Sequence, residues 1–142
     1  MIVLDTNVVS EPMKAGASSA VLAWLDQQVA DTLYLTATSL AELLVGIQTL
    51  PDGKRKDGLD AALSELMIGL FGPRILPFDQ QAAMAYAPMV GRARAAGRAI
   101  SVADGQIASI AAVHGFAVAT RDAAPFLAAG VPVINPWEEG RR

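Results

Sequence analysis

The sequence predicts an α/β protein, a three-layer α/β/α sandwich around a central, mostly parallel sheet. Short apolar runs alternate with amphipathic helical stretches along the whole chain. Parallel strands require crossover helices, and these helices cover both faces of the sheet. The 142 residues, of which 53% are hydrophobic, suffice for one such core, so we expect a single domain over residues 1–142.

The chain begins with a strand, a helix and a second strand. Residues 2–4 are an apolar run closed by Asp5, which predicts a buried strand that ends in a polar loop. Ser18 or Ser19 is a suitable cap for an amphipathic helix. Residues 33–36, Leu-Tyr-Leu-Thr, have the composition of the next strand.

Two further helices are expected before the third strand. From Ser39, leucine and isoleucine recur at helical spacing, and Pro51-Asp52-Gly53 ends that helix. Lys54-Arg55-Lys56 is expected in the connecting loop. The next helix runs from about residue 57 to residue 70, where a Gly-Pro pair follows.

The second half of the chain continues the alternation. Asp79 is a suitable cap for a helix that ends near Gly97, and Ser101 precedes a stretch, 102–113, that is apolar on nearly every face. Such a helix is expected to pack inside the domain. The remaining expected strands lie at 74–76, 116–119 and 131–134.

Composition excludes several classes of site and location. Cysteine is absent and His114 is the only histidine, so disulfides, cysteine nucleophiles and Cys/His zinc sites are excluded. His114 precedes a glycine at a helix end and is expected to act as a C-terminal cap. No apolar run has the length of a membrane span and the start lacks a signal-peptide pattern, which predicts a cytoplasmic protein without membrane contact.

Four acids lie at the predicted strand ends and helix starts: Asp5, Glu42, Asp104 and Asp122. Each also has a structural explanation. The Ser-x-x-acid spacing before Glu42 and Asp104 resembles a capping box, and the other two acids are possible N-caps.

The four acids together favour a metal site. Asp104 shares a helix face with Ala108 and Ala111 on a helix that is expected to be buried, where an unpaired carboxylate costs several kcal/mol. If the acids converge, their mutual repulsion requires a counter-ion. Oxygen ligands alone select a hard cation, Mg²⁺ or Mn²⁺, and such a site suits the hydrolysis of phosphodiesters.

Five segments, in order, resemble those of one family. They are Met-Ile-Val-Leu-Asp-Thr-Asn at the start, Ser-x-x-Glu at 39–42, Asp-Gly-Gln-Ile-Ala at 104–108, Ala-Thr-Arg-Asp at 119–122 and Val-Ile-Asn-Pro-Trp at 133–137. The chain resembles the PIN-domain ribonucleases, and more closely the VapC toxins of bacterial toxin–antitoxin pairs in their FitB-like branch. Each segment alone is weak, but five in order at element ends are specific.

The resemblance implies an Mg²⁺- or Mn²⁺-dependent ribonuclease. Asp5, Glu42 and Asp104 match the three main metal-site acids of the family, and Asp122 matches a fourth, more variable one. Thr120 and Asn7 match supporting positions. All four acids are present, which implies a catalytically competent toxin.

The resemblance also implies partners. These are an RNA substrate, a second copy of the chain in a homodimer, and a cognate antitoxin in an apolar groove near the early helices. The candidate groove residues are Trp24, Leu25, Leu40, Leu44, Leu66 and Leu70, although core packing is an alternative for most of them. The RNA-binding candidates are Arg92, Arg94, Arg98 and Arg121, of which the last could instead pair with a site carboxylate.

Two other functions remain possible. The apolar strand that ends in Asp5-Thr6-Asn7 also resembles the nucleophile loop of haloacid-dehalogenase-type phosphatases. That family has a second aspartate where Asn7 stands and a distal lysine, whereas no lysine follows Lys56. The other alternative is a catalytically silent PIN-fold interaction module, which the intact acids disfavour.

Overall fold

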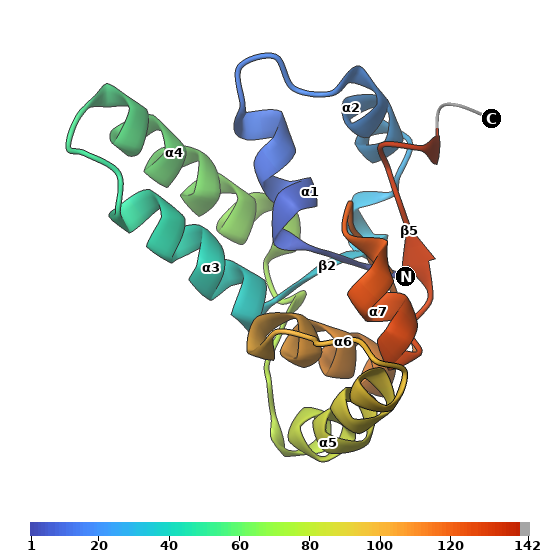
Figure 1. Ribbon diagram of the computed structural model, residues 1–142. Coiled ribbons are helices and arrows are strands. Elements are labelled where there is room, and N and C mark those ends of the chain that lie inside the picture. The colour runs from blue at the N-terminus through green and yellow to red at the C-terminus, as the bar shows by residue number, and fades with distance from the viewer. Residues whose placement is uncertain (140–142) are drawn as a thin grey trace.

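The computed structural model describes residues 1–139 and confirms the predicted α/β fold (Figure 1). The sheet has five strands in the order β3-β2-β1-β4-β5, and every neighbouring pair is parallel. The strands are β1 (Ile2–Leu4), β2 (Leu33–Thr36), β3 (Ile75–Leu76), β4 (Ala117–Ala119) and β5 (Val133–Ile134). Strand order changes direction around β1, and α/β proteins bind ligands at such a point.

Helices connect the strands and form the two outer layers. The α-helices are α1 (Thr6–Ser10), α2 (Ser19–Asp26), α3 (Ala37–Gln48), α4 (Lys54–Glu65), α5 (Gln80–Ala95), α6 (Val102–His114) and α7 (Ala123–Ala129). Short helical turns η1 (Glu11–Met13) and η2 (Ala30–Thr32) and a π-helical segment η3 (Leu66–Phe71) complete the set. Over residues 1–139, none of these helices has both the length and the hydropathy of a membrane span.

Alternation along the strands divides the core between the two faces of the sheet. Val3 packs into one cluster with side chains of α5, α6 and α7, whereas its neighbour Leu4 packs into another with side chains of α1 to α4. Val118 and Ala119 of β4 divide in the same way. This division is the three-layer arrangement that the sequence predicts.

Helix α6 is confirmed as the central helix of its layer. Its middle residues, 107–111, are fully or almost fully buried, and Ser101 caps its first turn as predicted. Gly105 allows close packing against α5, because a Cβ there would come within 2.7 Å of the Tyr86 ring. Asp104, in the first turn of this buried helix, is half-buried.

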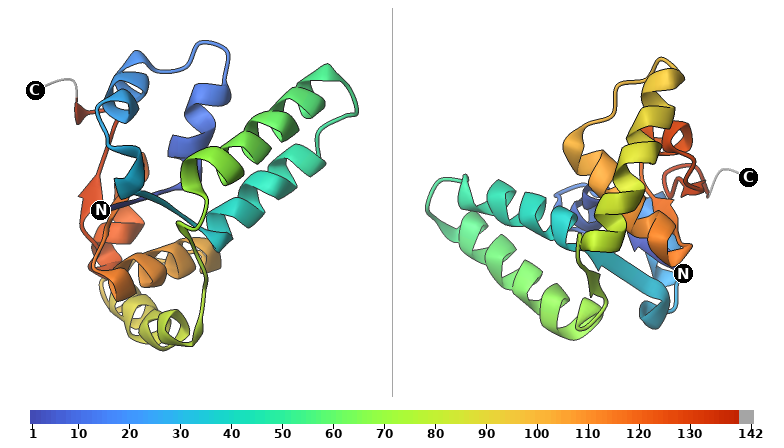
Figure 2. Two further views of the ribbon diagram at one scale, coloured as in Figure 1. Left: turned by 180° about the vertical axis from the view of Figure 1, so that it is seen from behind. Right: turned by 90° about the horizontal axis from the view of Figure 1, so that it is seen from below.

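Helices α3 and α4 form an antiparallel hairpin that projects from the body of the domain, as both views in Figure 2 show. Lys54-Arg55-Lys56 lies in the first turn of α4, so its predicted place in a loop was wrong. Lys56 donates to the Gln48 carbonyl and pairs with Asp52, which ties the two ends of the hairpin loop together. The basic residues 54–56 are therefore part of α4, and the side chain of Lys56 connects this helix to the end of α3 and to the loop between them.

The carboxyl ends of the strands bring the acidic residues to one edge of the sheet. Asp5 follows β1, Asp122 lies three residues beyond β4, and Glu42 lies in the helix that follows β2. Because α6 precedes β4 and returns across the sheet, its first turn with Asp104 also lies at this edge. The topology alone thus places four carboxylates on the same side.

Candidate functional site

Asp5 is the most constrained of the four acids. It is 5% exposed, and its two carboxylate oxygens accept from different donors. Oδ1 accepts from the Thr6 backbone amide at 2.8 Å, and Oδ2 accepts from the Thr120 hydroxyl at 2.8 Å. Asp5 therefore does cap α1, as the structural explanation predicts, but one further bond crosses to β4 and fixes the carboxylate against its neighbour strand.

Thr120 organises the interior of the site. Its hydroxyl oxygen accepts from the Asp122 amide at 3.1 Å and from the Asn7 side-chain amide at 3.4 Å. Because these donors occupy the lone pairs, the hydroxyl proton points to Asp5. The Asn7 orientation is determined as well, since its Oδ1 accepts from the Arg121 backbone N–H at 3.3 Å. Thr120 and Asn7 thus hold the acid in place, as expected of supporting residues.

Glu42 reaches the site from α3, although the predicted capping box at its start is wrong. Thr36, the last residue of β2, caps this helix by accepting from the Ser39 amide at 3.0 Å, so Glu42 lies in the second turn. Its exposed carboxylate accepts from the Thr6 hydroxyl at 2.9 Å. This bond joins α3 to the residue that follows Asp5, and no pattern in the sequence singles out Thr6 for this contact.

Asp104 and Asp122 complete the acidic edge. The Asp104 amide donates to the Ser101 hydroxyl at 3.1 Å, which confirms that cap. Asp122 occupies the N-cap position of α7, but its side chain makes no cap bond, so the capping role considered for it is wrong. Its carboxylate is exposed.

Burial and mutual repulsion disturb the ionisation of two acids. Desolvation raises the pKa of Asp5 to about 6, with smaller contributions from the negative charges of Asp104 and Glu42, against the bonds from Thr120 and Thr6. Desolvation also raises the pKa of Asp104, and the charges of Asp122 and Glu42 add to that effect. The charges of neighbouring acids therefore add to desolvation at both Asp5 and Asp104.

The donor set fits a hard divalent cation. All candidate ligands are carboxylate oxygens, and the ion pairs of residues 1–139 join Lys14 to Glu11, Lys56 to Asp52 and Arg74 to Asp31, so none of them neutralises the four acids. Within the same residues, no three acids are close enough to hold one ion together. The Glu42 carboxylate accepts from the Thr6 hydroxyl.

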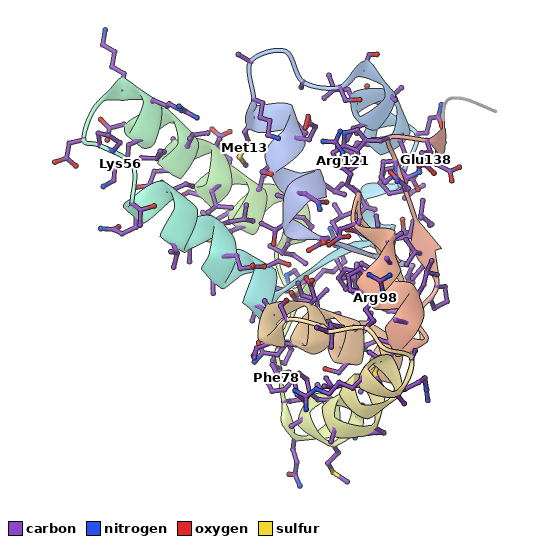
Figure 3. The ribbon with its side chains drawn as sticks, viewed as in Figure 1. Met13, Lys56, Phe78, Arg98, Arg121 and Glu138 are labelled. Carbon is purple, nitrogen blue, oxygen red and sulfur yellow. The ribbon has the colours of Figure 1, made fainter. Side chains whose placement is uncertain are left out.

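The four arginine candidates lie in different surroundings. Arg92 donates to the Ala129 carbonyl at 3.0 Å and packs against Gly130, so it caps the C-terminal end of α7. Arg94 and Arg98 are exposed near the end of α5 and in the α5–α6 connection (Figure 3). The Arg121 guanidinium lies 5.1 Å from the Trp137 ring centroid, in a cation–π contact rather than an ion pair with a site acid.

Two features near the acids, one hydrogen bond and one buried hydroxyl, had no signal in the sequence. Thr38 in the first turn of α3 donates to the Gln106 side chain at 2.9 Å, which joins the helices that carry Glu42 and Asp104. Ser39 is fully buried, and its hydroxyl is without a partner among residues 1–139. Both depend on how α3 packs against α6, which residue spacing does not reveal.

Two adjoining grooves run from the acidic edge between α1 and the α3–α4 hairpin. The first, of about 920 Å³, has Thr6 and Glu42 at one end. The second, of about 640 Å³, is mainly apolar and includes Leu25, Leu66 and Leu70, three of the predicted groove residues. Met13, Arg55 and Leu59 line both grooves, so they form one continuous depression. Trp24, in contrast, is 7% exposed and belongs to the core.

The fold and the site together define a class of protein. It is a three-layer α/β domain with carboxylates from four separate segments, and a supporting threonine, at the carboxyl edge of a parallel sheet. The family model of the PIN domain matches residues 2–130 of this chain. The chain belongs to the PIN-domain family. This membership excludes the haloacid-dehalogenase alternative.

Similar proteins match the chain over nearly its whole length. VapC ribonuclease Y4jK of Sinorhizobium fredii is 49% identical over 138 residues, which are 97% of this chain and 99% of that protein. Toxin FitB of Neisseria gonorrhoeae is 45% identical over 139 residues, 98% of this chain and 100% of that one. The crystal structure of FitAcB from the same organism superposes with a TM-score of 0.92 at 45% identity, covering 96% of this chain and 99% of the other. Within the PIN-domain family, the chain thus groups with the VapC ribonucleases and FitB.

Proposed function

We propose that this protein is a divalent-metal-dependent endoribonuclease that acts in the cytoplasm as the toxin of a type II toxin–antitoxin pair. The observation that carries the proposal is Asp5, a buried carboxylate with a pKa raised to about 6, beside three further acids and no compensating cation among residues 1–139. Such an arrangement is unfavourable as structure alone and favourable as a ligand set. The relatives named ribonuclease and toxin support the same function.

Asp5, Glu42 and Asp104 would hold Mg²⁺ or Mn²⁺, with Asp122 at the edge of the site. The chemistry that this ion supplies to nucleases is the activation of water and the neutralisation of charge on the phosphate. Thr120 keeps the Asp5 carboxylate oriented towards the other acids and the Asp122 backbone in place. Asn7 fixes the hydroxyl of Thr120 and the backbone of Arg121, so both ends of this network are preorganised.

Exposed arginines beside the acids would position the RNA backbone. Arg94 and Arg98 lie before the helix whose first turn carries Asp104, and both are exposed, whereas Arg92 donates to the Ala129 carbonyl at the end of α7. Contacts of this kind position a strand without reading its sequence. We therefore assign the phosphate contacts to Arg94 and Arg98.

The continuous depression beside α4 suits an antitoxin segment. Its apolar lining matches the apolar face of an amphipathic helix, and its far end opens at Thr6 and Glu42, so an occupant could reach the acids. Occupancy of this groove would explain inhibition by direct obstruction. A homodimer is the assembly that the resemblance to this branch of the family implies.

The test is cleavage of a single-stranded RNA by the purified chain with Mg²⁺, with Mn²⁺ and with EDTA. We expect cleavage with either ion and none with EDTA, and products with a 5′-phosphate and a 3′-hydroxyl, because water rather than a ribose 2′-hydroxyl is the nucleophile. Products with 2′,3′-cyclic phosphates, or full activity of metal-free protein, would refute the mechanism. An inactive protein that still binds RNA would instead support the silent interaction module.

A further inference from the structure

A third pocket lies on the same edge of the sheet as the acids but on the side of β5. It has a volume of about 530 Å³, within the range of roughly 300–1,000 Å³ that is usual for pockets that bind small molecules. Its polar residues follow strands: Arg121 comes directly after Thr120, and Asn135, Glu138 and Glu139 come after β5. Figure 3 shows Arg121 and Glu138 in the same region, near α2. The pocket therefore adjoins the acidic edge, because its lining residue Arg121 lies between Thr120 and Asp122 in the chain.

The pocket is built from parts of fixed geometry. The Arg121 guanidinium lies over Trp137, and its backbone amide is held by Asn7. The turn after β5 is closed by bonds to Asn135, whose side chain accepts from the Trp137 amide at 3.0 Å and whose carbonyl accepts from the Glu138 amide at 3.0 Å. Arg121 and Glu138 thus project from braced backbone rather than from free loops.

The chemistry of the lining selects a nucleobase over a phosphate. Ala123, Leu127 and Val133 give the pocket an apolar surface, and the carboxylates of Glu138 and Glu139 repel phosphate. An arginine plane held on one face by tryptophan offers its other face for stacking of a base. A single carboxylate can accept two hydrogen bonds side by side, and guanine is the base that presents a ring N–H and an amino group next to each other.

We propose that this pocket is a guanine-binding subsite, in which Glu138 accepts from the Watson–Crick edge of the base and Arg121 stacks on its face. The inference deepens the proposed ribonuclease function, since the bound guanine would belong to the RNA strand whose phosphate lies at Asp122 and Asp5. Uracil, which presents one ring N–H between two carbonyls, lacks the second donor and is disfavoured. The acidic site would thus cleave the RNA, and this pocket would determine the position of cleavage by binding a guanine.

The first experiment measures base binding without cleavage. Saturation-transfer NMR is recorded for 5′-GMP, AMP, CMP and UMP with the wild-type chain in EDTA. We expect GMP to bind at least about five-fold more tightly than UMP, the lower end of what a bidentate base contact contributes. Glu138→Gln should remove this preference, whereas Glu65→Gln, an exposed carboxylate on α4, should retain it. Equal binding of all four nucleotides, or a GMP preference that survives Glu138→Gln, would overturn the inference.

Arg121→Lys separates a base site from a phosphate site. Lysine keeps the charge but has no planar face, so GMP binding should fall if the guanidinium stacks on the base. Unchanged GMP affinity, with ribose 5-phosphate binding as well as GMP, would show a phosphate site and refute the proposal.

The second experiment cleaves matched oligonucleotides with each of the four bases in turn beside one scissile phosphate, in Mg²⁺. We expect the guanine substrate to be preferred by wild type and Glu65→Gln but not by Glu138→Gln. If wild type cleaves nothing, the proposed function fails while the NMR result still decides the subsite. If it cleaves without a base preference that depends on Glu138, the subsite fails and the nuclease stands.

Discussion

Replacing Asp5 by asparagine should separate function from stability. The substitution keeps the shape of the side chain and removes its charge. Asparagine Oδ1 can still accept from the Thr6 amide, so the cap of α1 is retained. RNA cleavage should nevertheless fall by at least about 100-fold, because a metal-site ligand contributes no less than the groups that orient it.

The magnitude of the stability change follows from the pKa. A pKa raised from 3.8 to about 6 means that the ionised carboxyl destabilises the metal-free fold by about 3 kcal/mol at neutral pH. Removing the charge in Asp5→Asn recovers only part of this stability, because the asparagine Nδ2 faces a Thr120 hydroxyl that already accepts from Asn7 and Asp122. One unfavourable polar contact of this kind costs about 1–2 kcal/mol. Asp5→Asn should therefore be about 1–2 kcal/mol more stable than wild type in EDTA.

The pH dependence isolates the charge from the contacts. Because folding raises the pKa of Asp5, the folded state binds its proton more tightly than the unfolded state does. The stability gained from this proton is fully present below pH 3.8 and is lost as the pH rises through about 6. Asparagine has no such dependence, so the stability difference between variant and wild type should narrow by roughly 1 kcal/mol from about pH 8 to about pH 5.

Urea unfolding followed by circular dichroism in EDTA, at both pH values, measures these differences. Asp60→Asn on the exposed face of α4 is the matched control and should leave stability within about 0.5 kcal/mol of wild type at each pH. If Asp5→Asn is less stable than wild type at both pH values and the difference does not change with pH, the carboxylate serves as a cap and the reasoning from its burial is wrong.

Three further substitutions test the surroundings of Asp5. Thr120→Val removes the hydroxyl that donates to Asp5, so the rate of RNA cleavage should fall by about 10–100-fold. Thr120→Ser keeps a hydroxyl and should restore cleavage. An equal loss in both variants would contradict a role of the hydroxyl. Glu42→Gln removes an exposed carboxylate, so the free energy of unfolding measured with urea should change by less than about 0.5 kcal/mol. The affinity for Mn²⁺, measured by electron paramagnetic resonance, should decrease. His114→Ala should leave Mg²⁺-dependent cleavage within about two-fold of wild type, because the exposed ring stacks on Phe116 at the end of α6; an inactive variant would make the imidazole part of the chemistry.

The sequence predicted the position of the four acids at strand ends and helix starts, because topology brings these boundaries to one edge of the sheet. Asp5 and Asp122 follow parallel strands, and Asp104 begins a helix that leads back to the next strand, so strand and helix boundaries alone bring them to one edge. Boundaries set by side-chain caps were less predictable. Thr36 and Ser39 are both good caps, and the choice of Thr36 depends on the pairing of β2 with β3, which extends through Thr36.

The sequence does not predict the hydrogen-bond register of a helix or the stacking of side chains that are far apart along the chain. The apolar spacing before Phe71 suits an α-helix and a π-helix alike, but the Gly72 amide donates to the Met67 carbonyl five residues back. Arg121 likewise offered a choice between a carboxylate and a phosphate, and the structure places it over Trp137, sixteen residues along the chain. Neither arrangement leaves a periodic signal.

The energetic cost of the site falls unequally on its members. Glu42 and Asp122 are exposed to solvent. Asp5 is buried, yet it is also the acid with the most donors, from Thr6 and Thr120. Those two bonds hold the carboxylate in one orientation, but they do not cancel its desolvation, since its pKa is still raised. A positive charge is the remaining means of stabilising it, and the exposed acids are free to rearrange around that charge while Asp5 stays fixed.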